Sequence, residues 1–402
     1  MTRPLQDRPL SGLCVLELGQ MVAAPYCGKL LADLGADVIK IERPRVGDGA
    51  RRRGPFPGGV PHPEKSGLFL YLNTSKRGIT LDLETEAGRG IFLRLVADAA
   101  ALIDDWPPGE LARIGLDPDA LARANPRLVH TSITPFGASG PHRDFRTHHL
   151  NVYHSSPHTT FSTPAEGAPR RAPPRAGRYL AEYDAGLSAA VGTMAAVLGA
   201  LATGTGERVE VSKQEALLCL ERVDIGRQIN PPKPPPWTGS IGGLLRAKDG
   251  WVMVTPVQNH QWEGLVRAMG SPEWTRSEAC KDEAARQAHR DEIQPRIQEW
   301  ADGLTRAEIY HRLQAEGTPA GPIQTVAEVR VWPQERERDF FVEIDHPEAG
   351  AQTYPSVPYR FDDVGWTGSR APLLGEHNRE ILGERLGHAS GELARLAASG
   401  VI

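Results

Sequence analysis

The sequence predicts an α/β protein with a large domain and a smaller one, and three observations support this. The first 42 residues alternate an apolar run, a helical pattern and a second apolar run. Further apolar runs of strand length alternate with helical patterns as far as residue 224. A proline-rich segment at 230–236, NPPKPPP, then interrupts the pattern. Alternating strands and helices favour a parallel sheet, and the proline segment indicates a domain boundary.

The opening strand–helix–strand unit is the clearest part of this pattern. Residues 13–18, LCVLEL, are typical of a buried strand, and residues 37–42 form a second one. Between them, Pro25 suits the first turn of a helix and Gly35 suits its end. Strands this close in sequence are expected to be parallel, with a right-handed crossover. The unit lacks the GxGxxG pattern, so a nicotinamide or flavin site is not favoured.

The other elements of the large domain follow in order. Residues 44–66 are rich in Pro, Gly and Arg and are expected to form a surface loop. Lys76 and Arg77 precede a short strand, and they either face a phosphate or form a solvated charged turn. An apolar helical face is expected at 91–96, strands at 101–105, 128–133 and 206–212, and helices at 110–116 and 213–224.

Residues 135–162 are unusually rich in histidine, with His142, His148, His149, His154 and His158. Neither HExxH nor a Cys/His pairing is present, so no metal site is predicted. A loop that lines a cleft and donates one histidine to chemistry is the favoured interpretation.

A Pro-, Arg- and Gly-rich loop leads into Ala181-Glu182-Tyr183-Asp184-Ala185-Gly186-Leu187, and an Ala- and Gly-rich helix follows through Ala202. Glu182 and Asp184 have two interpretations. They are acidic residues of a first helical turn, where the helix dipole favours them. Alternatively, one of them is a partly desolvated carboxylate that can be reached from a cleft.

The second half of the chain has shorter elements. Lys248-Asp249-Gly250 is a hairpin-type turn before a strand at 251–255, and Pro322 closes the smaller domain. The tail is expected to return to the large domain. Helices are expected at 262–269, 291–300, 305–314, 376–386 and 391–398, and strands at 341–344 and 358–361. The predicted segments are 1–228 and 326–402, which together form the large domain, and 229–325, which forms the small one.

Composition excludes several classes of protein. The net charge of -4, with 24% charged residues, gives no reason to expect nucleic acid or an acidic membrane as a partner. Four separated cysteines fit a reducing cytoplasm better than a disulfide framework or a zinc site. The N-terminus has no apolar core of a signal peptide, and no apolar run reaches about 18 residues. We therefore expect a cytoplasmic protein that does not span a membrane.

Several motifs, in order along nearly the whole chain, resemble the class III CoA-transferases of the CaiB/BaiF type. This family includes formyl-CoA transferase, carnitine CoA-transferase and alpha-methylacyl-CoA racemase. The motifs are LGADVIKIERP at 34–44, KR at 76–77 with TLDL at 80–83, PG at 108–109 with RIGL at 113–116, KDGW at 248–251, PAGP at 319–322 and APLLGEH at 371–377. The resemblance implies a Rossmann-like large domain built from both chain ends, a smaller central α+β domain, and two subunits interlocked as a homodimer.

The resemblance also implies a catalytic carboxylate. The family's catalytic Asp lies in an Ala-Asp-x-x-x-Gly-Leu pattern, and Glu182 occupies that position here. In the transferases the carboxylate attacks an acyl-CoA, forms a mixed anhydride and then an enzyme thioester, and CoA passes to an acceptor acid. Both intermediates are activated acyl groups, so one difficult exchange becomes two easier ones. Acyl-CoA and a small carboxylic acid are the implied substrates, with no tightly bound cofactor and no metal.

A second chemistry is left open by residues 147–149. Many transferases have Gly-Tyr-Asp at this place, whereas the racemase branch has Gly-His-Asp, whose histidine aligns with His148. His148 and Glu182 could exchange the proton on the carbon alpha to a thioester. His148 could instead be a hydrogen-bonded cleft residue that orients substrate. Three hypotheses result: CoA transfer, racemisation or epimerisation of an acyl-CoA, and a CoA-binding protein without catalysis.

Family CoA contacts fall by position on eight residues of this chain: Gln20, Val22, Ala23, Arg43, Leu81, Asp105, Arg113 and Ile114. Arg43 and Arg113 can bind phosphate or stack on adenine. Gly242 and Gly243 resemble the glycine loop that covers the transferase active site. Small residues there would let the loop approach the intermediates closely.

Overall fold

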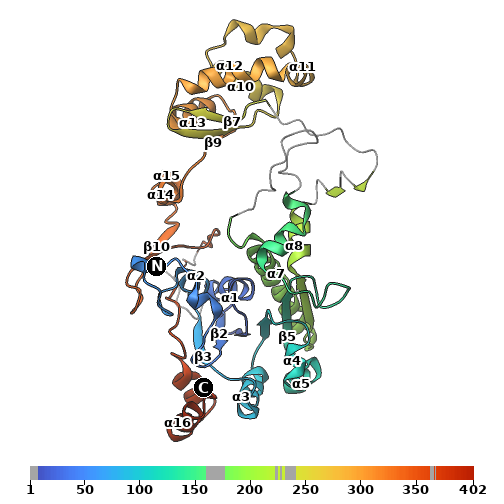
Figure 1. Cartoon of the computed structure of the whole chain (residues 1–402), viewed down its shortest axis with the longest axis vertical. Helices are drawn as coiled ribbons and strands as arrows, with labels where there is room; N and C mark the ends of the chain where they lie inside the picture. Colours follow the sequence, from blue (N-terminus) through green and yellow to red (C-terminus); the bar gives the residue numbers. More distant parts are fainter. Residues whose placement is uncertain are drawn as a thin grey trace. The chain divides into compact units, whose positions relative to one another are not determined.

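The computed structural model describes residues 8–159, 177–221, 225–226, 229–230, 241–362, 366 and 368–402. The chain divides into two compact units, Met1–Ile229 with Asp339–Ile402, and Asn230–Arg338 (Figure 1). The second crossing between units comes later than the predicted residue 326. Helices α14 (Val326–Arg330) and α15 (Pro333–Glu337) belong to the second unit, where Arg306 Nη2 lies 2.6 Å from Glu328 Oε1. Most of the predicted proline linker, residues 231–236, lies outside the described residues.

The first unit is built on a parallel sheet, as predicted. Its described strands have the order β3-β2-β1-β4-β5-β6, and every neighbouring pair is parallel. Each strand except β3 lies within two residues of a predicted range, and β3 begins at Arg77, which was expected to precede a strand. The strands are β1 (Cys14–Glu17), β2 (Asp37–Glu42), β3 (Arg77–Thr80), β4 (Ala101–Asp104), β5 (Val129–Thr134) and β6 (Arg208–Ser212).

Helices cover both faces of this sheet and form two apolar cores. On one face, α1 (Ala23–Asp33) and α7 (Leu180–Thr203) pack on alternate strand residues such as Val15 and Ile103. On the other face, α3 (Glu86–Ala97), α4 (Glu110–Arg113) and α5 (Pro118–Ala124) pack on residues such as Leu16 and Leu102. Because successive strand residues point to opposite faces, one strand serves both cores.

Helix α7 approaches α1 unusually closely because its first turns carry small residues. A Cβ atom on Gly186 would lie 2.6 Å from the carbonyl oxygen of Ala23, so only glycine fits at this contact. By length and composition α7 could also cross a membrane, which corrects the expectation that no apolar run reaches about 18 residues. It nevertheless packs against α1, β5 and β6, which is the arrangement of a core helix in an α/β domain.

The tail returns to the edge of β3. The amides of Gly78 and Thr80 donate to His377 Nδ1 at 3.1 Å and to Asn378 Oδ1 at 2.9 Å. A π-helical turn (Arg379–Arg385) and α16 (Ser390–Ala398) follow. The strand predicted at 358–361 is wrong: β10 (Phe341–Ile344) pairs antiparallel with β11 (Gln352–Pro355) instead. Reciprocal backbone hydrogen bonds between His346 and Gly350 turn the chain back early enough for this pairing.

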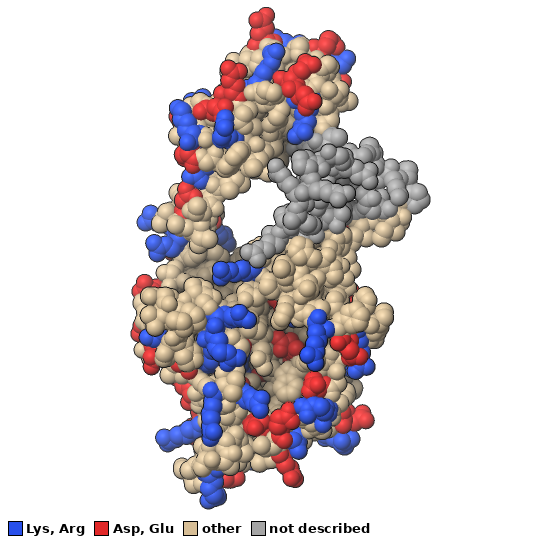
Figure 2. All heavy atoms as spheres, viewed as in Figure 1, with Lys and Arg blue, Asp and Glu red and all other residues tan. Residues whose placement is uncertain are grey.

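The second unit contains an antiparallel sheet, β7 (Gly243–Ala247), β8 (Gly250–Val254) and β9 (Ala320–Pro322). Residues of its helices, including Trp262, Ile297 and Leu313, pack with the sheet into a separate core. The helices are α10 (Asn259–Ala268), α11 (Glu283–Ala288), α12 (Arg290–Asp302) and α13 (Arg306–Ala315). Acidic and basic side chains are interspersed over the visible face of each unit (Figure 2).

Two charged segments are more buried than predicted. Arg51, in the supposed surface loop, is 1% exposed and its guanidinium binds Glu42, at 2.7 Å. Lys76 faces neither phosphate nor solvent, because its ammonium lies 2.7 Å from Glu17 Oε2 inside the fold. Helices α2 (Gly67–Leu72), α6 (His149–His154) and α8 (Lys213–Leu220) complete the first unit. Helix α6 lies in the histidine-rich segment that was expected to be a loop.

Candidate active site

The strand order reverses direction between β1 and β4, and the candidate site lies at their carboxyl ends. From β1 the chain proceeds to β2 and β3 on one side, whereas β4 leads to β5 and β6 on the other. Loops after such neighbouring strands diverge and leave a crevice that commonly binds ligands. Here the amide of Gln20, after β1, donates to both carboxylate oxygens of Asp105, after β4, at 3.0 and 3.2 Å.

A buried network of charges holds the loop after β1. Lys40 Nζ donates to the carbonyl of Gly19 at 3.0 Å and lies 2.9 Å from both Glu17 and Asp48. Asp48 Oδ1 accepts from the amide of Met21 at 2.8 Å. Met21 has a left-handed backbone, with φ 61°, which is unfavourable for a residue with a side chain. The network therefore fixes a strained turn at the floor of the crevice.

Glu182 reaches the crevice from the first turn of α7. Tyr179 precedes the helix in a left-handed conformation, and its carbonyl accepts from the amide of Glu182 at 3.0 Å. The Glu182 side chain is 12% exposed, and its Oε2 lies 2.6 Å from Lys213 Nζ. The close contact of α7 with α1 brings this turn beside residues 20–22. Glu182 is thus a largely buried carboxylate at a helix entry, as the cleft interpretation predicted.

Glu182 lines a cavity of about 340 Å³ together with His148 and three of the predicted CoA contacts, Gln20, Val22 and Asp105. Loops that follow β1, β4, β5 and β6 all contribute to its wall. The remaining lining residues are Met21, Trp106, Pro107, Thr147, His149, Tyr179 and Lys213. His148 is exposed at the start of α6, where its amide donates to Asn151 Oδ1 at 3.0 Å.

Asp105 is the lining residue with the most perturbed acidity. Burial raises the pKa of Asp105 to about 7, with further contributions from the negative charges of Asp48 and Glu182. Lys213 and the Gln20 amide oppose this increase because they stabilise the charged form. A carboxyl group that changes charge near neutral pH therefore lies beside Glu182.

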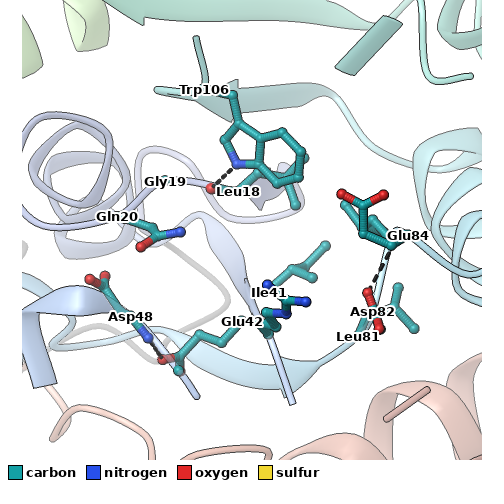
Figure 3. A pocket seen from close by; sticks show the side chains of 13 residues that line it. Leu18, Gly19, Gln20, Ile41, Glu42, Asp48, Leu81, Asp82, Glu84 and Trp106 are labelled. Carbon is teal, nitrogen blue, oxygen red and sulfur yellow. Dashed lines mark hydrogen bonds between the residues drawn. The ribbon is translucent and has the colours of Figure 1, made fainter. Parts of the chain in front are cut away.

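A second hollow, of about 200 Å³, adjoins the first and shares Gln20 and Trp106 with it. Arg43 and Leu81, two further predicted CoA contacts, line this hollow after β2 and β3. Figure 3 shows the Trp106 indole donating to the carbonyl of Leu18, at 3.0 Å. Gln20, Asp48, Asp82 and Glu84 surround the opening in the same view. The two hollows together form an extended crevice along the carboxyl edge of the sheet.

Other predicted residues lie outside these hollows. Arg113 forms ion pairs with Glu84 at 2.7 Å and Glu110 at 2.8 Å. Ala23 and Ile114 are buried in the two cores, with 0% and 6% of their surface exposed. Their roles as CoA contacts stay predictions.

Gly242, Gly243 and Asp184 are also absent from the lining of the two hollows. Gly242 and Gly243 belong to the second unit, where Gln294 holds the Gly242 backbone through two hydrogen bonds. Their role as an active-site loop stays a prediction. Asp184 is not among the residues that line the cavity with Glu182, and burial raises its pKa.

Lys213 is the functional candidate that the sequence analysis missed. It begins α8 directly after β6, and its side chain is 12% exposed. The signal was a lysine at a strand-to-helix junction on the same edge of the sheet as the other loops. Within the described ranges no group of three His, Cys, Asp or Glu could hold a metal ion.

Comparison with known proteins gives a consistent result. Residues 10–378 match CoA-transferase family III. The chain is 30% identical to the succinyl-CoA–L-malate CoA-transferase beta subunit of Chloroflexus aurantiacus, over 98% of both chains. It is 30% identical to a formyl-CoA:oxalate CoA-transferase of Rhodopseudomonas palustris, over 98% of this chain and 97% of the relative.

Similarity extends to a solved structure of a CaiB/BaiF family protein from Brucella suis. The two share a TM-score of 0.82 and 30% identity, over 94% of this chain and all of the other. The family match over residues 10–378 includes most of both units. The chain therefore belongs to the class III CoA-transferase family.

Proposed function

We propose that this enzyme moves CoA between an acyl-CoA thioester and a free carboxylic acid, with Glu182 as the nucleophile. The observation that carries the proposal is the position of the Glu182 carboxylate. It is largely buried, is paired with Lys213 at 2.6 Å, and lines the same cavity as Gln20, Val22 and Asp105. A carboxylate in such a place is held by its partner and screened from bulk water, as a nucleophile requires.

The reaction proceeds through four balanced steps. A Glu182 oxygen attacks the thioester carbonyl, a C–O bond forms, and the C–S bond breaks to release the CoA thiolate. The thiolate then attacks the Glu182 carbonyl, which releases the first acid and leaves an enzyme thioester. The acceptor carboxylate attacks this thioester and expels the thiolate again. Attack of the thiolate on the acceptor carbonyl releases the new acyl-CoA and regenerates the Glu182 carboxylate.

The crevice supports a binding mode for CoA. Arg43 is exposed beside the second hollow and can pair with a phosphate. Gln20, Val22 and Asp105 line the cavity that also contains Glu182. Arg113 would have to exchange its pairing with Glu84 for one with the ligand. Gly242 and Gly243, with φ of 91° and 64°, are the proposed counterpart of the family's glycine loop.

The names of the relatives suggest the first substrates to test. Purified enzyme should transfer CoA from succinyl-CoA to L-malate, or from formyl-CoA to oxalate, and the thioester products can be separated chromatographically. Hydroxylamine should trap an activated acyl group on Glu182 when acyl-CoA is added without acceptor. Absence of both transfer and trapping across a panel of acids would contradict the proposal and favour a protein that only binds CoA.

A second candidate function is racemisation or epimerisation at the carbon alpha to a thioester. The observation that favours it is that His148 lines the same cavity as Glu182. Incubation with a 2-methylacyl-CoA in heavy water, without acceptor, separates the two functions. Incorporation of deuterium at the alpha carbon would support racemisation. New thioester that forms only with an acceptor acid, without deuteration, supports transfer.

We also propose that the enzyme acts in the cytoplasm as an interlocked homodimer. Outward residues of α7 form an apolar stripe in this chain, with 50–66% of each side chain exposed: Leu187, Val191, Leu198 and Leu201. A surface of this kind is typical of an interface. Sedimentation of the Leu198→Glu variant should show loss of the dimer or aggregation. A wild-type chain that sediments as a monomer at micromolar concentration would contradict this assembly.

A further inference from the structure

Lys213 is rigidly placed by its neighbours. Ser212 ends β6 opposite Thr134 and caps α8 by accepting from the Glu215 amide at 3.2 Å. On the other side, the amide of Gln214 donates to Pro135 O at 3.1 Å, and its side chain donates to Ser155 O at 2.7 Å. The backbone on both sides of Lys213 is therefore fixed by hydrogen bonds. The Lys213 side chain lines the cavity.

The charges around the cavity are unequal. Among the described residues that line it, Lys213 is the one Lys or Arg, whereas Glu182 and Asp105 are both acids. The Lys213 side chain is 12% exposed, so its ammonium has little access to water. A largely buried ammonium requires a negative partner, because desolvation disfavours an uncompensated charge. Glu182 is that partner in the resting enzyme.

We propose that Lys213 binds the carboxylate of the acid substrate in the enzyme thioester, and that during turnover it exchanges Glu182 for this carboxylate. This inference rests on the proposed function. While Glu182 is free, Lys213 pairs with it. When Glu182 becomes a thioester it loses its negative charge, and Lys213 keeps its positive one. The departing acid, and then the incoming acceptor, each bring a reacting carboxylate group with one negative charge, and this group takes the place of Glu182 beside the ammonium.

This exchange couples acid binding to the covalent state of the enzyme. In the resting state the Glu182 carboxylate occupies Lys213 and repels a second carboxylate. In the enzyme thioester the Lys213 ammonium attracts the acceptor acid. At this stage a carboxylate oxygen of the acceptor must attack the Glu182 carbonyl. Lys213 therefore contacts the carboxylate group of the acid substrate. It contributes no proton and no covalent bond to the transfer.

A binding experiment tests this exchange without requiring turnover. Glu182→Gln replaces the charged carboxylate by a neutral group of the same shape. Formation of the enzyme thioester likewise removes the negative charge of Glu182. Calorimetric titration with oxalate, L-malate, succinate and formate should show at least one acid binding Glu182→Gln about tenfold more tightly than wild type. Adding Lys213→Met to Glu182→Gln should remove the gain. Adding Lys281→Met, which removes an exposed ammonium of the second unit, should keep it. Unchanged acid affinity in Glu182→Gln, or a gain that survives Lys213→Met, would overturn the inference.

Kinetics distinguish acid binding from simple support of Glu182. With succinyl-CoA and L-malate, or formyl-CoA and oxalate, Lys213→Met should raise the KM for the acid by about tenfold or more, with an unchanged KM for acyl-CoA. Lys213→Arg should restore part of the acid affinity. A lower kcat with an unchanged KM for the acid would show that Lys213 only positions Glu182. If wild type transfers CoA to none of these acids, the proposed function fails for them, and the titrations still decide the role of Lys213.

Discussion

The rings of His149 and Tyr179 pack with their centroids 4.7 Å apart, which joins the start of α6 to the start of α7. His148 directly precedes this contact on one side, and Glu182 follows it by one helical turn on the other. Both ends of the contact line the cavity. The two candidate catalytic residues are therefore held in the same cavity through one aromatic pair, although 33 residues separate them in sequence (182 minus 148 leaves 33 between).

Glu182→Gln should abolish turnover and leave CoA affinity nearly unchanged, because it removes the nucleophilic oxygen and keeps the shape of the side chain. Turnover of succinyl-CoA with L-malate and calorimetric titration of CoA measure the two effects. Asp184→Asn is the matched control, since Asp184 lies outside the cavity lining and should not be needed for the reaction. Turnover that survives in Glu182→Gln but is lost in Asp184→Asn would show that Asp184, and not Glu182, is the nucleophile.

Arg43→Ala should weaken CoA binding by about tenfold, because one exposed phosphate contact contributes about 1.4 kcal/mol. The matched control is Arg52→Ala, since Arg52 is also exposed but donates to the carbonyl of Val46, at 3.1 Å. Titration of CoA into each variant measures the difference. Equal CoA affinities for the two variants would show that Arg43 does not contribute to CoA binding.

Asp105→Asn should stabilise the protein at alkaline pH. The folded-state pKa of about 7 is above the unfolded value of about 3.9. The folded protein therefore holds this proton more tightly, and the resulting stability is full below about pH 4 and lost as pH rises through about 7. At 1.36 kcal/mol per pKa unit, the free energy of unfolding that the variant recovers by pH 8 is at most about 4 kcal/mol.

Urea unfolding of Asp105→Asn and wild type at pH 5 and pH 8 checks this expectation. The advantage of the variant should be larger at pH 8. Asp119→Asn, on the exposed side of α5, controls for the general effect of removing a negative charge. An advantage that is independent of pH would show that Asp105 does not titrate in this range.

Lys40→Met should lower the free energy of unfolding by about 3–5 kcal/mol, because it leaves Asp48 buried without its cation and leaves Glu17 with Lys76 alone. It should also release the turn at Gly19–Met21 and lower turnover. Arg246→Met is the control, since the ion pair of Arg246 with Asp302 is exposed and should contribute little. Comparable unfolding curves for the two variants would contradict a structural role for the Lys40 network.

The sequence by itself determined the order of the elements in the large domain. Apolar periodicity placed β1, β2, α1 and β5 within two residues, because each is a local pattern with clear turn residues beside it. The strand at 358–361 was misplaced for the opposite reason. β11 is selected by pairing with β10 across a turn, and pairing is not a local property.

The tertiary structure decided which charged residues meet. Lys76 and Arg51 look like surface residues in a basic, glycine-rich sequence, yet both are buried because acids from β1 and β2 neutralise them. Motif resemblance identified Glu182 as a candidate. Its pairing with Lys213, 31 residues later (213 minus 182), depends on α7 packing over the sheet and on β6 adding beside β5. Sequence patterns specify local conformation, whereas ion pairs in the crevice depend on distances that only the packed fold sets.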